Sequence, residues 1–134
     1  MDVTKDGEVT EALKYVQERC RSTEKKVLDG GGPVELCSIK FYKEVCEVNL
    51  FGAIRVSKAF LPLVRQAKGR VINVSSERGR LARGGNATYC ISKYSLEAFS
   101  DALRHEMRRF GVQVSLIEPA HFGGATAILL EHNG

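Results

Sequence analysis

The chain has 134 residues, of which 43% are hydrophobic and 27% are charged, and it carries a formal net charge of +4 at pH 7. A chain of this length and composition forms one globular domain at most, and it is unlike a disordered or fibrous protein. No apolar run approaches the ~18 residues of a membrane-spanning helix, so we expect no membrane span.

The first predicted elements lie before position 34. Thr4 or Asp6 can cap a helix over about residues 7–21, in which apolar residues recur at helical spacing. Residues 25–28 favour a very short strand, and residues 29–33 form a glycine-rich loop. This loop does not predict a phosphate cradle, because no long strand precedes it and no Lys-Ser or Lys-Thr pair follows it.

A long helix is predicted from Ile39 to about Gln66, with Ser38 as its N-cap. Pro62 should bend this helix or end its regular bonding, because proline has no N–H to donate. Its apolar residues form one broad face, and they are Val45, Val48, Phe51 (or Gly52), Ile54, Ala59, Leu63 and Val64. We expect this face to be covered by other parts of the fold or by another copy.

A strand is predicted from Arg70 to Val74. Its continuous apolar character is typical of a parallel sheet that is buried on both faces. The segment from Glu77 to Asn86 is predicted to be a loop. It holds the densest basic group of the chain, Arg78, Arg80 and Arg83, without an aromatic platform beside it. We therefore expect a solvated loop and no nucleic-acid partner.

A second long helix is predicted from Thr88 to about Phe110, where Gly111 ends it. A second strand follows over residues 112–117, and Pro119 closes it. The alternation of helices and strands indicates an α/β protein. Ligands of such folds lie beyond the carboxyl ends of the strands, and Ser76 and Pro119 fall at those ends.

Three residues suggest acid/base chemistry. Tyr89 and Lys93 are four residues apart and share a helix face, and Ser76 follows a strand. A nearby cation lowers the pKa of a phenol from its usual value near ~10, so Tyr89 is a candidate acid/base near neutral pH. Ser76 could bond the same substrate oxygen. The alternatives are an amphipathic helix with a half-buried tyrosine and a solvated lysine, and a serine that caps the strand end.

Together with the sequence around them, Ser76, Tyr89 and Lys93 resemble the active-site core of the short-chain dehydrogenase/reductase family. Asn49, in Glu47-Val48-Asn49-Leu50-Phe51-Gly52, resembles the asparagine of the family's central helix. Asp2 resembles the aspartate of the turn after the third family strand, and Glu118-Pro119 resembles the Pro-Gly turn after the sixth. The match extends with gaps from Asp2 to about Thr126. It is most similar to the 3-hydroxybutyrate dehydrogenase and retinol/hydroxysteroid dehydrogenase branch.

The resemblance implies a partial Rossmann-like, doubly wound parallel sheet, with residues 1–134 as a single partial catalytic domain. It implies that the complete parent protein transfers a hydride between NAD or NADP and a secondary alcohol or ketone of the 3-hydroxybutyrate, retinoid or steroid type. The implied catalytic residues are Asn49, Ser76, Tyr89 and Lys93. The implied cofactor-binding residues are Asp2, Tyr89, Lys93, Pro119 and Thr126.

The chain also departs from the family pattern. The family's glycine-rich loop that cradles the pyrophosphate does not precede Asp2, and residues 27–33 stand where the family has Asn-Asn-Ala-Gly. The alternative is therefore a catalytically inactive truncated remnant or an oligomer-interface module, and we expect little activity from the isolated chain. The helices beginning near Ile39 and Thr88 resemble those of the family's dimer interface, so a homo-oligomer is also expected.

The cysteines indicate the compartment and exclude a metal site. Cys20, Cys37, Cys46 and Cys90 are not in Cys-x-x-Cys spacing, and no histidine lies at metal-ligand spacing from them. Such a set favours reduced thiols in an intracellular protein, and no signal peptide is recognisable at the N-terminus. We expect an intracellular location, mitochondrial or cytoplasmic, and no metal.

Overall fold

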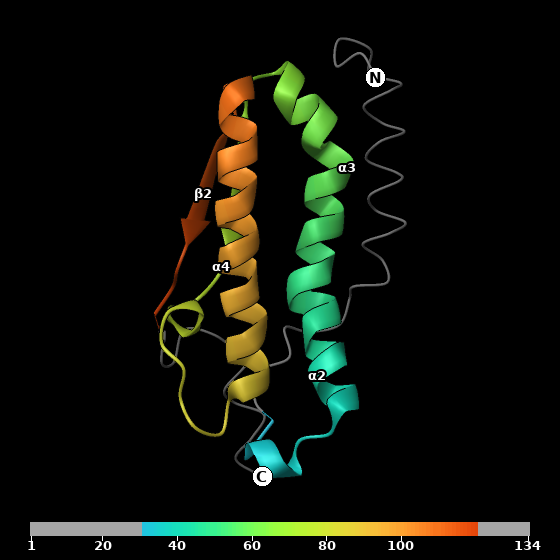
Figure 1. Cartoon of the computed structure of the whole chain (residues 1–134), viewed down its shortest axis with the longest axis vertical. Coiled ribbons are helices and arrows are strands. Elements are labelled where there is room, and N and C mark those ends of the chain that lie inside the picture. The colour runs from blue at the N-terminus through green and yellow to red at the C-terminus, as the bar shows by residue number, and fades with distance from the viewer. Residues whose placement is uncertain (1–30, 121–134) are drawn as a thin grey trace.

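The structure is a computed structural model that describes residues 31–120 (Figure 1). The helix predicted over residues 7–21 and the strand predicted over residues 25–28 lie outside the described residues, as do Asp2 and Thr126.

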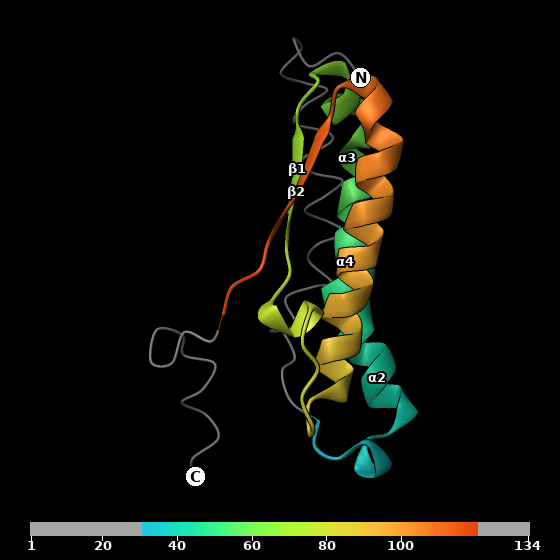
Figure 2. The ribbon, with the colours of Figure 1, turned by 60° about the vertical axis from the view of Figure 1, so that its left-hand side comes forward.

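Two parallel strands and long helices make up the described part of the chain. β1 and β2 pair in parallel, with Arg70 opposite Gln113 and Val74 opposite Ile117. Figure 2 shows α3 and α4 together on one side of the strands. The α/β prediction is therefore confirmed. The elements in chain order are a 3-10 helix (Val34–Leu36), α2 (Ile39–Cys46), a π-helical turn (Glu47–Phe51), α3 (Gly52–Gln66), β1 (Arg70–Val74), a 3-10 helix (Glu77–Gly79), α4 (Ala87–Met107), a 3-10 helix (Arg108–Phe110) and β2 (Gln113–Ile117).

The long helix predicted from Ile39 to Gln66 has the predicted ends, and the Ser38 side chain accepts a hydrogen bond from the Phe41 N–H at 3.2 Å. The π-helical turn inside it was not predicted. Because a π turn holds an extra residue, it shifts the helical phase. Of the residues that the pattern placed on one apolar face, Phe51 and Ala59 are exposed.

Pro62 lies inside α3, which continues to Gln66, so the proline does not end the helix. Proline removes one backbone hydrogen bond. The neighbouring side chains of Leu61 and Val64 pack against the hydrophobic core and keep this turn in place.

The hydrophobic core lies between the second half of α4 and the starts of the strands. Leu103 and Met107 of α4 are buried against Val112 and Val114. Gly111 ends the preceding helical segment in the left-handed conformation (φ 71°), as its position predicted. The residues that surround this core are Leu61, Val64, Val71, Phe99 and Phe110.

The prediction that the first strand is buried on both faces is wrong for the described part of the chain. Ile72 and Val74 of β1 are 51% and 56% exposed, and Ile117 of β2 is 50% exposed. Alternate residues of a strand point to opposite faces. Within residues 31–120, α3 and α4 cover one face of the sheet and leave these side chains on the other (Figure 2).

Candidate active site

The first half of α4 buries mostly polar side chains, together with Cys90 and Leu96, whereas the second half buries Leu103 and Met107 as well as Ser100. Buried polar groups in proteins are normally hydrogen-bonded or paired, so their partners indicate what holds this region together. The buried polar residues of the first half are Thr88, Ser92, Lys93 and Glu97.

Lys93 extends from α4 to the end of β1. Its side-chain ammonium donates a hydrogen bond to the Val74 carbonyl at 3.0 Å, and the residue is 7% exposed. Burial lowers the pKa of Lys93, and the carboxylate of Glu97 partly opposes this shift. The alternative of a solvated lysine is therefore excluded.

Tyr89 lies one helical turn before Lys93 and is half-buried. The Lys93 ammonium is 5.6 Å from the centroid of the Tyr89 ring. The predicted pairing of a phenol with an ammonium on one face of this helix is therefore confirmed. A cation at this range favours the negative form of a phenol.

Ser76 is buried directly after β1, and its hydroxyl oxygen accepts a hydrogen bond from the Arg78 N–H at 3.2 Å. Ser76 thereby caps the 3-10 helix Glu77–Gly79, which is the alternative role that its sequence position allowed. Accepting this bond does not use the hydroxyl proton, because serine can accept and donate at once.

Asn49 lies in the π-helical turn and is buried. Its side-chain amide donates to the Ser92 hydroxyl at 3.1 Å, and that hydroxyl donates to the Tyr89 carbonyl at 2.8 Å. Asn49 therefore connects this turn to α4 through its side-chain amide. π turns inside helices occur frequently at functional sites. Ser92 was not selected from the sequence, although it lies one turn after Tyr89 on the same helix.

Pro119 follows β2 and fixes the segment that carries Ser76. The Pro119 carbonyl accepts a hydrogen bond from the Glu77 N–H at 3.0 Å, and the Ile117 carbonyl accepts one from the Ser75 N–H at 2.8 Å. Ser76, Pro119 and the ammonium of Lys93 are thus brought to the carboxyl ends of the two strands. The other predicted cofactor residues, Asp2 and Thr126, lie outside the described residues.

The donors at this edge fit the sugar end of a nicotinamide cofactor. The Lys93 ammonium has three N–H donors, and one of them bonds to the Val74 carbonyl. A phenol and an ammonium are suitable partners for the hydroxyl groups of a ribose. We therefore regard Tyr89 and Lys93 as the residues that would hold the ribose.

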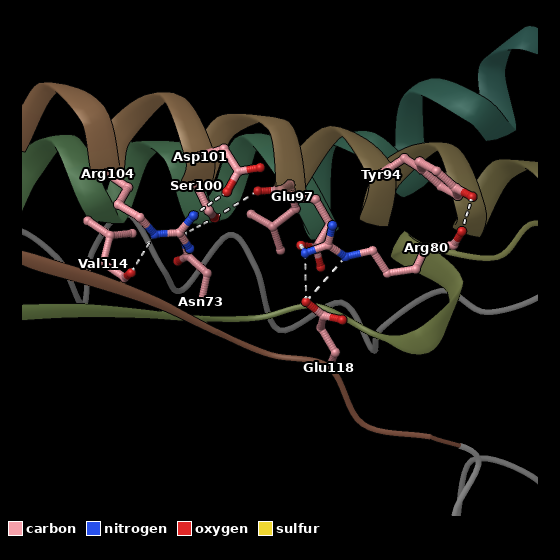
Figure 3. A network of polar contacts seen from close by, with 10 residues as sticks. Asn73, Arg80, Tyr94, Glu97, Ser100, Asp101, Arg104, Val114 and Glu118 are labelled. Atoms are coloured by element: carbon pink, nitrogen blue, oxygen red, sulfur yellow. Dashed lines mark hydrogen bonds and ion pairs between the residues drawn. The ribbon is translucent and has the colours of Figure 1, made fainter.

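The loop after Ser76 differs from its prediction. The side chain of Arg78 is only 16% exposed, so this part of the loop is not solvated. Arg80 forms ion pairs with Glu97 of α4 and with Glu118 (Figure 3). Neither carboxylate was predicted to belong to the site, although Glu97 is four residues after Lys93 and therefore shares its helix face.

The part of the chain that the structure describes agrees with the thiol prediction. Cys37, Cys46 and Cys90 are free, and Cys20 lies outside this part. Over the same residues, no group of three or more His, Cys, Asp or Glu side chains is placed to hold a metal ion. None of the described helices is long and apolar enough to cross a membrane.

Comparison with known proteins identifies the family. The family model for short chain dehydrogenases matches residues 1–132. The mitochondrial D-beta-hydroxybutyrate dehydrogenase of Bos taurus is 46% identical over 136 residues, which cover 96% of this chain and 40% of that protein. Retinol dehydrogenase 7 of Rattus norvegicus is 45% identical over 129 residues, which cover 91% of this chain and 40% of that protein.

A solved structure of a metagenomic short-chain oxidoreductase in complex with NADP is 25% identical, with a TM-score of 0.67, and the match covers 82% of this chain and 54% of that one. The chain spans 40% of the length of the two curated relatives. The family match and the parallel α/β fold confirm the resemblance on which the site residues were chosen, and the chain belongs to the short-chain dehydrogenase/reductase family.

Proposed function

We propose that this chain carries the acid/base part of an oxidoreductase that uses a nicotinamide cofactor and acts on a secondary alcohol or ketone. The observation that carries the proposal is the buried ammonium of Lys93. It lies at the end of β1, 3.0 Å from the Val74 carbonyl and 5.6 Å from the centroid of the Tyr89 ring. A buried cation is costly, and such arrangements concentrate at functional sites.

Tyr89 is the proposed acid/base. In oxidation, its phenolate takes the proton of the substrate hydroxyl, and in reduction its phenol returns that proton to the new alkoxide. Lys93 favours the phenolate through its positive charge and holds the cofactor ribose. When bound, the nicotinamide supplies the hydride chemistry, and the protein orients it.

Ser76 is the proposed donor to the developing alkoxide. A donor aimed at such a charge is worth about 3 kcal/mol in the transition state. The Asn49 side chain reaches the backbone of Tyr89 through Ser92, with hydrogen bonds of 3.1 and 2.8 Å. We propose that Asn49 holds a water that links Lys93 to solvent. Pro119, Asp2 and Thr126 complete the proposed cofactor contacts.

The names of the relatives guide the choice of substrate, cofactor and compartment. They act on D-beta-hydroxybutyrate and retinol by name, and the first is mitochondrial. We propose a substrate of the 3-hydroxybutyrate, retinoid or steroid type and an intracellular, mitochondrial or cytoplasmic, location. One solved relative holds NADP and another holds NAD, so either nicotinamide cofactor is a candidate.

A turnover assay with a matched pair of variants tests the proposal. The chain and the full-length parent protein that contains it are each incubated with NAD+ or NADP+ and, in turn, D-beta-hydroxybutyrate, retinol or a hydroxysteroid, while reduced nicotinamide is followed by absorbance; the variants are compared in the full-length protein. Tyr89→Phe should lower turnover by about 10²–10⁴-fold, because it removes the acid/base group. Tyr42→Phe removes a phenol hydroxyl from α2 and should leave the rate unchanged.

Retained turnover in Tyr89→Phe would remove the proposed role of that residue. A folded wild-type chain without turnover or cofactor binding would instead favour the alternative of an inactive module that retains the family fold.

A further inference from the structure

Arg80 lies between two carboxylates that belong to different elements (Figure 3). Its guanidinium donates to one oxygen of Glu118, just beyond β2, at 3.0 and 3.3 Å. The same guanidinium is 3.2 Å from a carboxylate oxygen of Glu97 on α4. One side chain thereby connects the loop after Ser76 both to the helix that carries Tyr89 and to the end of the second strand.

Of the two carboxylates that pair with Arg80, Glu97 is the unusual one. The residue is 5% exposed, and its carboxylate oxygens make no hydrogen bond in the described part of the chain apart from the ion pair with Arg80. A buried carboxylate is costly unless it is paired. The Arg80 guanidinium is itself largely exposed, and ion pairs between exposed groups stabilise a protein little. The contact matters because the Glu97 carboxylate is buried.

The loop is also packed tightly against Glu97. A Cβ built on Gly79 would lie 2.9 Å from the Glu97 Cγ and 2.6 Å from the Ser75 hydroxyl oxygen. Only a residue without a side chain therefore allows this approach. The backbone is held as well, because the Tyr94 hydroxyl of α4 donates to the Arg80 carbonyl.

We propose that Arg80 is a positioning residue, which bridges Glu97 and Glu118 and so fixes the Ser76 segment against Tyr89 and Lys93. The proposal rests on the proposed function, since a fixed Ser76 matters only if its hydroxyl serves a reaction. It adds three residues to the site, Arg80, Glu97 and Glu118, none of which contacts the reacting atoms.

Turnover and hydrogen exchange of Arg80 variants test the proposal. Arg80→Met should speed amide exchange at Gly79 and Leu81, whose N–H groups bond to the Ser76 and Glu77 carbonyls. It should also lower kcat by about 10–100-fold with KM within about twofold, because a small misplacement acts on the chemical step. Arg80→Lys keeps a cation and should recover part of both losses, although lysine does not reproduce the two-carboxylate contact.

Two further variants separate positioning from charge and from folding. Arg83→Met removes the same charge from the same exposed loop and should match the wild type in exchange and kcat. The double variant Arg80→Met/Glu97→Gln removes the unpaired buried charge, so its thermal midpoint should return toward the wild-type value while exchange at Gly79 stays fast.

The outcomes are distinguishable from those of the proposed function. Unchanged exchange in Arg80→Met, unchanged kcat despite faster exchange, or an equal loss in Arg83→Met overturns the positioning role. If the double variant recovers slow exchange together with its midpoint, the bridge is not what holds the loop, and the proposal fails. A wild-type chain without turnover refutes the proposed function and with it the catalytic meaning of the bridge, while exchange still decides whether Arg80 holds the loop.

Discussion

The two halves of α4 rest on the same pair of strands but differ in their buried side chains, since both charged ones lie in the first half. The second half places Leu103 and Met107 against Val114, and the first half buries Lys93 and Glu97 near the strand ends. Buried apolar surface contributes about 25 cal/mol per Å² to stability, whereas buried charge opposes folding. If the proposed function holds, the second half of the helix mainly stabilises the fold, and the first half carries buried charges that serve the reaction at a cost in stability.

The largest expected effect is a loss of turnover when a buried polar residue in the first half of α4 is replaced. Lys93→Met keeps most of the side-chain length and removes the ammonium, so turnover should fall by about 10²–10⁴-fold. The thermal midpoint should stay the same or rise, since a buried charge is lost. Lys58→Met, on an exposed position of α3, should change neither quantity. Retained turnover, or a large fall in the midpoint of Lys93→Met, would show that the polar half supports the fold instead.

The apolar half should respond in the opposite way. Leu103→Ala opens a cavity in the core and should lower the free energy of unfolding by about 2–5 kcal/mol, measured by urea denaturation. Leu81→Ala is a matched change at a side chain that is 57% exposed. It should shift the same quantity by less than about 0.5 kcal/mol. Equal effects of the two variants would contradict the location of the core.

A pair of glycine variants sharpens the comparison at the loop that connects β1 to the first half of α4. Gly79→Ala places a Cβ 2.6 Å from the Ser75 hydroxyl oxygen, so the loop must shift. We expect a loss of about 1–3 kcal/mol in the free energy of unfolding, as for overpacking elsewhere. A Cβ on Gly84 meets no atom within 4 Å, so Gly84→Ala should be neutral or slightly stabilising. If Gly79→Ala leaves the free energy of unfolding unchanged, the loop is not held against Glu97.

The smallest expected effect is a dependence of stability on pH. Burial lowers the pKa of Lys93 below its ordinary value of 10.5. Between the lowered pKa and 10.5 the unfolded chain binds more protons than the folded chain, so the unfolding free energy of the wild type rises with pH. The stabilisation is complete above 10.5 and is lost as the pH falls through the lowered pKa. Urea unfolding of the wild type minus that of Lys93→Met should show this rise, and a difference that does not vary with pH would contradict it.

Much of the fold was predictable because its signals are local. Ser38 caps α2 as its side chain suggests, Gly111 ends the helical segment after α4, and the apolar stretch Arg70–Val74 forms a strand. The π-helical turn was not predictable, since it depends on packing against α4 and leaves no distinct pattern in the sequence. The exposure of Ile72 was also missed, because apolar character alone does not say which faces of a strand are covered.

The site was predictable where spacing fixes geometry. Tyr89 and Lys93 are one turn apart in any helix, so their pairing followed from the sequence. The contact of Asn49 with Ser92 joins residues 43 positions apart, and no single-sequence signal reports such a distance. Arg80 was assigned to a solvated loop because the sequence shows its charge. The sequence does not show that the carboxylates of Glu97 and Glu118 lie beside it.

The most direct test of the central claim is the titration of the Lys93 side chain by NMR of a nitrogen-labelled protein. We predict that the pKa of Lys93 lies below 10.5, and that Glu97→Gln lowers this pKa further because the Glu97 carboxylate raises it. We also expect added NAD+ or NADP+ to shift the Lys93 signal. A Lys93 ammonium that titrates at or above 10.5 and does not respond to either cofactor would contradict the proposed acid/base site.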